Sequence, residues 1–269
     1  MGERLTKAPV YFALAQIQFN AILNLSTYLP AIQTKMRKRQ FSDYRPESTQ
    51  RLSFPFINLG EQAGQVIPPA IVNDVRYVFG HIDGASSFLL EQNGLTFMTT
   101  AYDTFHEFLD QIVTGLRFAH EEIQFDSVDR IGIRYLNAIR PLSEGEKLSD
   151  YLIEEVLGLS QKVAGPLVHS ISETVAASDA GQIMTRVLIS NGQVGVPMEL
   201  MALNPKINSK FLNGPSLHAI LDIDSSYIRK ETRIPFDLDS IEKRLVLLHD
   251  DIESSFLTIA KPHAFKIWK

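Results

Sequence analysis

Cysteine is absent from the 269 residues of the chain. This absence excludes disulfides, thiol nucleophiles, zinc–thiolate sites and iron–sulfur clusters. Long apolar runs are lacking as well: the early stretch VYFALA is soon followed by Gln16 and Gln18. That stretch is too short for a signal peptide or a membrane span. We therefore expect a cytoplasmic protein that does not associate with a membrane.

Basic residues are outnumbered, with 26 Lys and Arg against 31 Asp and Glu, which gives a net charge of -5. This balance disfavours binding of nucleic acid over the whole surface, although it leaves room for a local basic patch. The hydrophobic content of 45% and the charged content of 21% are typical of a globular protein with a full core.

Motifs that carry catalysis are also missing. The chain has no glycine-rich phosphate loop, no dinucleotide fingerprint and no nucleophile elbow. Its seven histidines show neither HxxxH nor HxH spacing. The run Asp222-Ile223-Asp224 directs two carboxylates to one face of a strand, which is more typical of a solvated face than of a two-metal site. The sequence thus predicts no catalytic residue, no cofactor and no metal site, and it favours a binding protein over an enzyme.

Hydrophobic periodicity predicts the same order of elements in each half of the chain: strand, helix, four strands and helix. In the first half these elements span 9–20, 25–39, 50–58, 72–80, 86–92, 95–100 and 102–121. In the second half they span 128–139, 148–157, 167–177, 182–190, 194–203, 217–225 and 236–259. Asn93-Gly94 and Asn191-Gly192 are predicted hairpin turns. Pro197 marks the 194–203 strand as an edge strand or a bulged one.

The repeated order predicts an internal duplication. The opening strands end alike, in FNAI and LNAI, and Asn137 follows Asn20 by 117 residues (137 minus 20). We therefore expect an α+β fold in which tandem β-α-β4-α units, residues 1–125 and 126–269, form one curved antiparallel sheet with helices packed on one face. This order resembles the TATA-binding-protein fold, a likeness of topology that carries no function with it.

Three stretches resemble a sporadically distributed family of uncharacterised bacterial proteins of about this length: KAPVYFALAQIQF, FLLEQNGLTFMTTAY and RIGIRYLNAI. The resemblance covers nearly the whole chain and implies no particular catalytic residue. The sporadic distribution is similar to that of mobile-element, toxin–antitoxin or phage-defence genes.

Four arginines are the candidate anion- or ligand-binding residues. Arg130 and Arg134 flank Gly132 on one face of a predicted strand, opposite its Ile and Tyr side chains, and Arg76 and Arg186 lie on other strands. If they converge on the open face of the sheet, their guanidinium groups suit a phosphate or carboxylate, and Gly132 would let a ligand come close. The alternative is cross-strand pairing with Asp or Glu.

Two further stretches are candidate partner-binding segments. The run KMRKRQ supplies Lys35, Arg37, Lys38 and Arg39, and the last segment, KPHAFKIWK, carries the only tryptophan, Trp268. The first could contact nucleic acid or an acidic partner, or be a solvated helix end. The second could dock on a partner or a neighbouring subunit, or fold back on its own sheet.

The first hypothesis from these observations is a non-catalytic binding or regulatory protein that docks a protein partner, in a toxin–antitoxin or phage-defence system. The alternatives are a nucleic-acid-associated regulator, which the acidic pI of about 5.8 disfavours, and a receptor or enzyme for a small anionic ligand held by the arginines. Homo-oligomerisation stays open.

Overall fold

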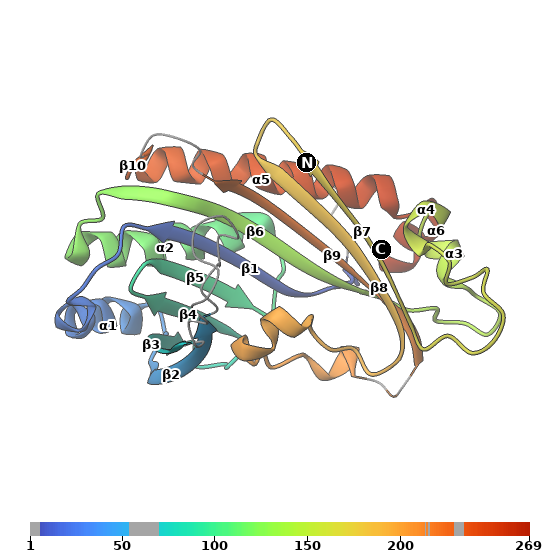
Figure 1. The fold of residues 1–269 in the computed structure, drawn as a ribbon, viewed down its shortest axis with the longest axis horizontal. Coiled ribbons are helices and arrows are strands. Elements are labelled where there is room, and N and C mark those ends of the chain that lie inside the picture. Colours follow the sequence, from blue (N-terminus) through green and yellow to red (C-terminus); the bar gives the residue numbers. More distant parts are fainter. Residues whose placement is uncertain (1–5, 54–69, 213, 215, 229–233) are drawn as a thin grey trace, which may run out of the picture.

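The computed structural model describes residues 6–53, 70–212, 214, 216–228 and 234–269. Within these residues, ten strands form a single antiparallel sheet with helices packed on it (Figure 1). The predicted α+β class with one antiparallel sheet is therefore confirmed.

The strands are β1 (Val10–Phe19), β2 (Asp43–Ser53), β3 (Ala70–Gly80), β4 (Ser86–Glu91), β5 (Gly94–Thr99), β6 (Ser127–Ile139), β7 (His169–Ala177), β8 (Gln182–Gly192), β9 (Ser216–Ile228) and β10 (Ile234–Pro235). The helices are α1 (Leu29–Lys38), α2 (Phe105–Ile123), α3 (Leu148–Tyr151), α4 (Glu154–Leu157), α5 (Leu238–Ile259) and α6 (Pro262–Trp268). Short 3-10 helices are η1 (Leu25–Thr27), η2 (Met198–Leu203) and η3 (Ser209–Phe211).

The sheet is built outward from the central pair β1 and β6, where Gln16 lies opposite Gly132. The strand order is β2-β3-β4-β5-β1-β6-β9-β8-β7, and β10 pairs with β6 beside this path. Strands from residues 1–125 therefore fill one side of the sheet and strands from residues 126–269 the other. Because β1 and β6 pair along their length, the two predicted units share one sheet.

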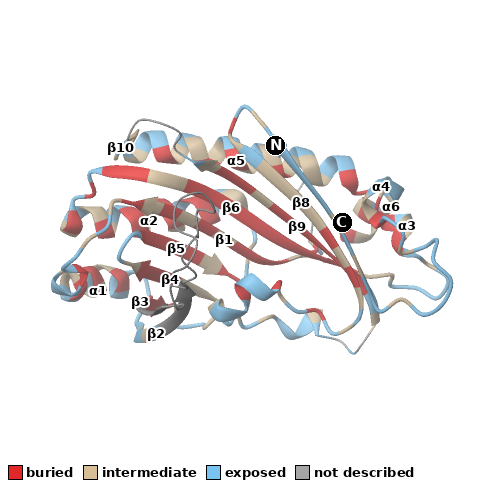
Figure 2. Cartoon of the chain, viewed as in Figure 1, coloured by how far each residue is buried: buried red, intermediate tan, exposed pale blue. Residues whose placement is uncertain are grey.

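One face of the sheet packs against α1, α2 and α5 and forms the main core. Alternation along β1 shows how the sequence achieves this: Ala13, Ala15 and Ile17 are buried toward the helices, while Gln16 and Gln18 project from the other face. We call that other face the open face. Figure 2 shows that burial is concentrated in the central strands and on the inner sides of the helices.

Helix α2 illustrates how local sequence sets the ends of an element. The side-chain oxygen of its N-cap, Thr104, accepts a hydrogen bond from the backbone N–H of Glu107 at 3.3 Å. The helix ends at Gln124, whose φ of 58° is left-handed. Its buried stripe consists of Phe108, Leu109, Ile112, Val113, Leu116 and Ala119. The predicted helix over 102–121 thus forms, two to three residues later in the chain.

The predicted strand over 194–203 is wrong. β8 continues to Gly192 and pairs there with Ser216 of β9, so Asn191-Gly192 ends a strand and is not a hairpin turn. Beyond it, residues 193–212 cross the open face as an irregular segment that contains η2 and η3; we call this segment the strap. Pro197 lacks a backbone N–H and stands at the N-cap of η2, where a 3-10 turn can begin but a sheet ladder cannot continue. The second half consequently lacks one of the four predicted strands, and the internal duplication stays a prediction.

Other boundaries differ in smaller ways. The predicted strand over 50–58 lies in part on β2, which begins earlier, at Asp43, and residues 54–58 fall outside the described residues. The predicted helix over 148–157 is split into α3 and α4, because Leu152 is extended and forms a bridge with Ala260. No helix in the described part of the chain combines the length and the apolar composition that crossing a membrane requires.

Candidate functional site

The four arginines predicted as site residues all lie on the open face of the sheet. Arg76 comes from β3, Arg130 and Arg134 from β6, and Arg186 from β8. Arg76, Arg130 and Arg134 line one cavity of about 590 Å³ between the sheet and the strap. Arg186 shares its acidic partners with Arg134. The structure therefore brings the four onto the same face, so the condition of convergence is met.

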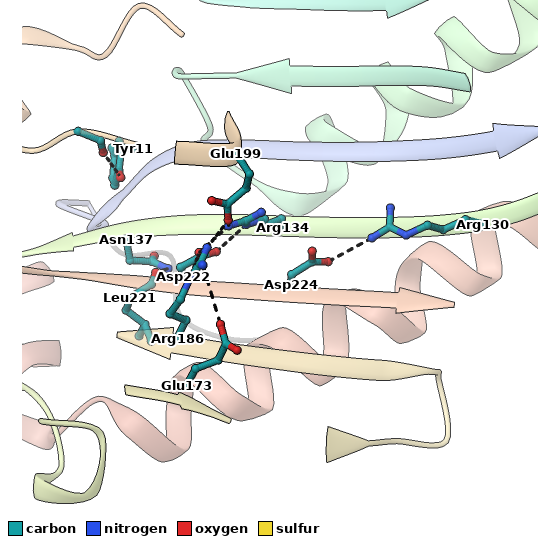
Figure 3. A network of polar contacts seen from close by, with 11 residues as sticks. Tyr11, Arg130, Arg134, Asn137, Glu173, Arg186, Glu199, Leu221, Asp222 and Asp224 are labelled. Atoms are coloured by element: carbon teal, nitrogen blue, oxygen red, sulfur yellow. Dashed lines mark hydrogen bonds and ion pairs between the residues drawn. The ribbon is translucent and has the colours of Figure 1, made fainter. Parts of the chain in front are cut away.

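The side chains of Arg134 and Arg186 form a compact ion-pair network with carboxylates (Figure 3). Arg134 donates from Nε to Oδ1 and from Nη2 to Oδ2 of Asp222, both at 2.7 Å, and Arg186 donates from Nη2 to Oδ2 at 2.7 Å. Asp222 is fully buried, so two guanidinium groups replace the water that its carboxylate loses. Glu199 of η2 accepts from both arginines, at 2.7 Å from Arg134. The network balances two positive and two negative charges.

The pKa of Glu199 is lowered by its place in this ion-pair network. Partial burial alone would raise it, but the hydrogen bonds from Arg134 and Arg186 outweigh that effect and lower the pKa to about 2. Glu199 is therefore ionised at neutral pH and anchors η2 to the sheet.

Three more contacts fasten the strap to the open face. Arg76 donates to the carbonyl of Ala202 at 2.5 Å while its Nη2 also pairs with Glu47 at 2.7 Å. Arg140 donates to the carbonyl of Phe211 at 2.6 Å. The hydroxyl of Tyr11 donates to the carbonyl of Gly195 at 2.6 Å. Val194 and Leu200 of the strap pack on the open face in a second apolar cluster, with Tyr11, Phe12, Leu136, Ala138 and Ile220 of the strands.

These contacts decide between the two interpretations of the arginines. Arg76, Arg134 and Arg186 each pair with a carboxylate, and their free donors go to the strap. They hold a segment of the same chain against the sheet and do not form an uncompensated cationic patch. These three arginines therefore match the alternative interpretation, in which they pair with Asp or Glu side chains.

Arg130 is arranged differently. Its guanidinium lies over Gly132, so the glycine accommodates this side chain and not a ligand. Arg130 donates to Oε1 of Gln16 at 3.1 Å, and its Nη2 is 3.7 Å from Oδ1 of Asp224. Figure 3 shows this pair apart from the network around Asp222. Burial raises the pKa of Asp224, and nearby arginines oppose that rise.

The basic run on α1 faces an acidic neighbour. Lys35 pairs with Glu121 at 2.6 Å, and Arg39 pairs with Asp110 at 2.7 Å, both across to α2. Arg37 and Lys38 are exposed at the end of α1. Two of the four predicted partner-binding charges therefore hold α1 against α2, and the other two match a solvated helix end.

Trp268 is not an exposed docking residue. It is only 6% exposed and packs against Phe256 and Phe265, with ring centroids 5.6 and 5.7 Å away. The expectation of an exposed aromatic tail is therefore wrong: the segment folds back, as in the alternative, and it packs on α3 and on Phe256 of α5. The backbone carbonyl of Trp268 accepts a hydrogen bond from the backbone N–H of Lys7 at 2.8 Å.

Strand β7 is the second surface of interest, because it forms the edge of the sheet on the side of residues 126–269. It pairs with β8, and no described residue pairs with its outer side. Its open-face residues Ile171 and Val175 are 60% and 52% exposed. Glu173, between them, lies 3.8 Å from Nη1 of Arg186. The opposite edge, β2, contains Pro46 within a row of charged residues.

Periodicity alone did not indicate Glu199, Asp222 or the edge character of β7. Asp222 and Asp224 share a strand face, which is a signal for a charged network, but the same pattern is typical of a solvated face. A partly buried polar pair, the hydroxyl of Tyr135 and Nδ1 of His249 at 3.2 Å, lies between β6 and α5. Among the described residues, no group of three or more His, Asp or Glu side chains is placed to hold a metal ion.

Comparison with protein-family models and with curated proteins found no match to this chain.

Proposed function

We propose that this protein is a non-catalytic binding protein that docks an extended segment of a protein partner along strand β7. The observation that supports the proposal is the contrast between the two edges of the sheet. Natural sheets protect their edges with proline, charged side chains, bulges or covering segments. β2 has Pro46 and neighbouring charges, whereas β7, HSISETVAA, has neither proline nor lysine, and no described strand pairs with its outer side.

The side chains of β7 indicate the partner that would fit. A strand added to this edge would gain main-chain hydrogen bonds, and pockets for alternate side chains would give specificity. Ile171 and Val175 would contact apolar side chains four positions apart on the partner, on either side of the residue opposite Glu173. Glu173 already has Arg186 nearby, so the partner needs no positive charge opposite it. We therefore infer an extended, largely apolar partner segment.

The strap extends this surface beyond β7. Arg186 contacts both Glu173 of β7 and Glu199 of η2, which places η2 on the same face as Ile171 and Val175. Met198 and Met201 of η2 are 82% and 61% exposed. Methionine is flexible and polarisable, and exposed apolar clusters of this kind are typical of protein interaction sites.

Nucleic acid is the less favoured partner. The arginines that would contact phosphate are paired with carboxylates, and so are Lys35 and Arg39. A phosphate-bound complex would also weaken steeply with salt, whereas an apolar strand interface would not. A toxin–antitoxin or phage-defence system is the setting we propose, and the identity of the partner would name it.

The test is affinity purification of the tagged full chain from its own host, with quantitative mass spectrometry of what is retained. The variants are Ile171→Lys and Val175→Lys, which place a charge on the edge, and the control is Leu247→Lys on α5, where Leu247 is 47% exposed. We expect a stoichiometric protein with the wild type and the control, and its loss with both β7 variants. Retention by the β7 variants would contradict the proposal, and so would a doubled mass of the isolated chain, which would place a second copy on the edge.

A further inference from the structure

The cavity of about 590 Å³ beside the strap contains polar groups that the fold does not use. Its floor is the open face of the central strands, and the strap forms one wall. It is lined by Leu14, Gln16, Gln18, Arg76, Leu89, Glu91, Thr96, Arg130, Gly132, Arg134, Glu199, Leu200, Ala202, Leu203 and Asp224. This volume lies within the range of small-molecule sites in proteins.

Arg130 and Asp224 face each other in this cavity without a hydrogen bond between them. The 3.7 Å from Nη2 of Arg130 to Oδ1 of Asp224 exceeds hydrogen-bond distance. Oδ1 of Asp224 is inaccessible to solvent and has no hydrogen-bond partner among the described residues. A guanidinium has five N–H donors, and Arg130 directs one to Gln16. A buried carboxylate oxygen without a partner is costly. The Asp224 side chain as a whole is 23% exposed, so a ligand in the cavity can donate to this carboxylate from its accessible side.

The remaining lining restricts what that ligand can be. Three positive side chains, Arg76, Arg130 and Arg134, face three negative ones, Glu91, Glu199 and Asp224, so the lining has no net charge. Arg130 and Asp224 neutralise each other across 3.7 Å, so a ligand with a single charge would bring an uncompensated charge into the cavity. A ligand with both charges would satisfy both groups. The apolar part of the wall comes from Leu14, Leu89, Leu200 and Leu203.

We propose that this cavity binds a zwitterion, namely an α-amino acid with an apolar side chain. The ligand carboxylate accepts hydrogen bonds from the guanidinium of Arg130, and its ammonium group donates to Asp224. The apolar side chain packs on the leucines of the wall. No residue of β7 lines this cavity, so binding of the amino acid and docking on β7 can be tested separately.

The test is isothermal titration calorimetry of the full chain with L-leucine, L-leucinamide and N-acetyl-L-leucine. The amide lacks the carboxylate and the acetylated form lacks the ammonium group. We expect saturable binding of L-leucine, and roughly ten-fold or greater weakening for each derivative, equal to about 1.4 kcal/mol. No binding of L-leucine at millimolar concentration, or equal affinity for the derivatives, would overturn the proposal.

Three variants locate the site. Arg130→Met and Asp224→Asn each remove one charge. Gly132→Ala adds a Cβ that would lie 2.8 Å from Nη1 of Arg130, so the flexible guanidinium must move while the backbone stays. We expect each variant to weaken L-leucine binding at least ten-fold, and Arg117→Met, on the exposed side of α2, to leave it unchanged. Unchanged affinity in all three would overturn the assignment. If a variant fails to fold, titration of the wild-type chain with L-leucine and its two derivatives still tests the proposal.

Discussion

Arg134 and Asp222 form a two-point ion pair across the neighbouring strands β6 and β9, with Nε–Oδ1 and Nη2–Oδ2 distances of 2.7 Å. Arg186 approaches the same carboxylate from β8, and Glu199 joins both arginines from the strap. The pair therefore does two things. It neutralises a fully buried carboxylate, and it fixes the strap against the open face.

Replacing Arg134 tests how much this pair stabilises the fold. Arg134→Met leaves Asp222 buried with only Arg186 as a partner, and breaking a buried ion pair from one side costs about 3 kcal/mol. We expect a loss of that size in the free energy of unfolding, measured by urea denaturation. Arg117→Met, an exposed arginine on α2, should change it by no more than about 0.5 kcal/mol. Equal stability of the two variants would show that Asp222 does not need Arg134.

The pH dependence of the free energy of unfolding should show how much the ionised carboxylate of Glu199 stabilises the fold. Its pKa is about 2 in the folded chain and ordinary in the unfolded chain. A lowered pKa stabilises the fold above the unfolded value, and this contribution disappears as the pH falls from about 5 toward 2. We expect the wild type to lose more stability over this interval than Glu199→Gln, in which that position cannot titrate. Parallel curves for the two proteins would contradict the anchoring role of Glu199.

The contact between α2 and the sheet depends on a missing side chain. Gly115 lies so close to the ring of Phe88, which is 1% exposed, that a Cβ at this position would overlap the ring. Overpacking of this kind costs about 2 kcal/mol. Gly115→Ala should therefore lower the thermal midpoint, while the same substitution at Gly195, where a Cβ meets nothing within 4 Å, should not. An unchanged thermal midpoint for Gly115→Ala would mean that α2 can shift away from Phe88 without loss of stability.

The buried position of Trp268 predicts a spectroscopic signature. Because Trp268 is the only tryptophan, fluorescence of the native chain should be shielded from acrylamide and should move to longer wavelength on unfolding. Trp268→Ala should cost about 3 kcal/mol of stability, since it empties a packed aromatic site beside Phe256 and Phe265. Quenching as strong as that of free tryptophan would restore the interpretation of an exposed docking tail.

Elements that bury one face could be predicted from the sequence. β1, β6 and β9 alternate, and α2 and α5 carry apolar stripes, because each lies between the core and a more polar side. The same alternation predicted that Arg130 and Arg134 project from the open face. Their convergence with Arg76 and Arg186 depends on the strand order, which alternation does not give.

The strap could not be predicted in this way. Val194 and Leu200 are apolar because they cover a cluster on the open face, so their pattern reports burial without reporting strand pairing. The roles of Glu199 and Asp222 depend on which segments meet in space. Long-range ion pairs of this kind leave no spacing signal in the sequence, and the edge position of β7 likewise follows from the strand order.

The measurement that tests the central claim most directly is amide hydrogen exchange of the purified complex against the isolated chain. The account predicts slower exchange in the complex for residues 169–177, because a partner strand on β7 would bond the outward-facing amides of that strand. Protection confined to α1 around Arg37 and Lys38, with residues 169–177 exchanging as fast as in the isolated chain, would contradict it.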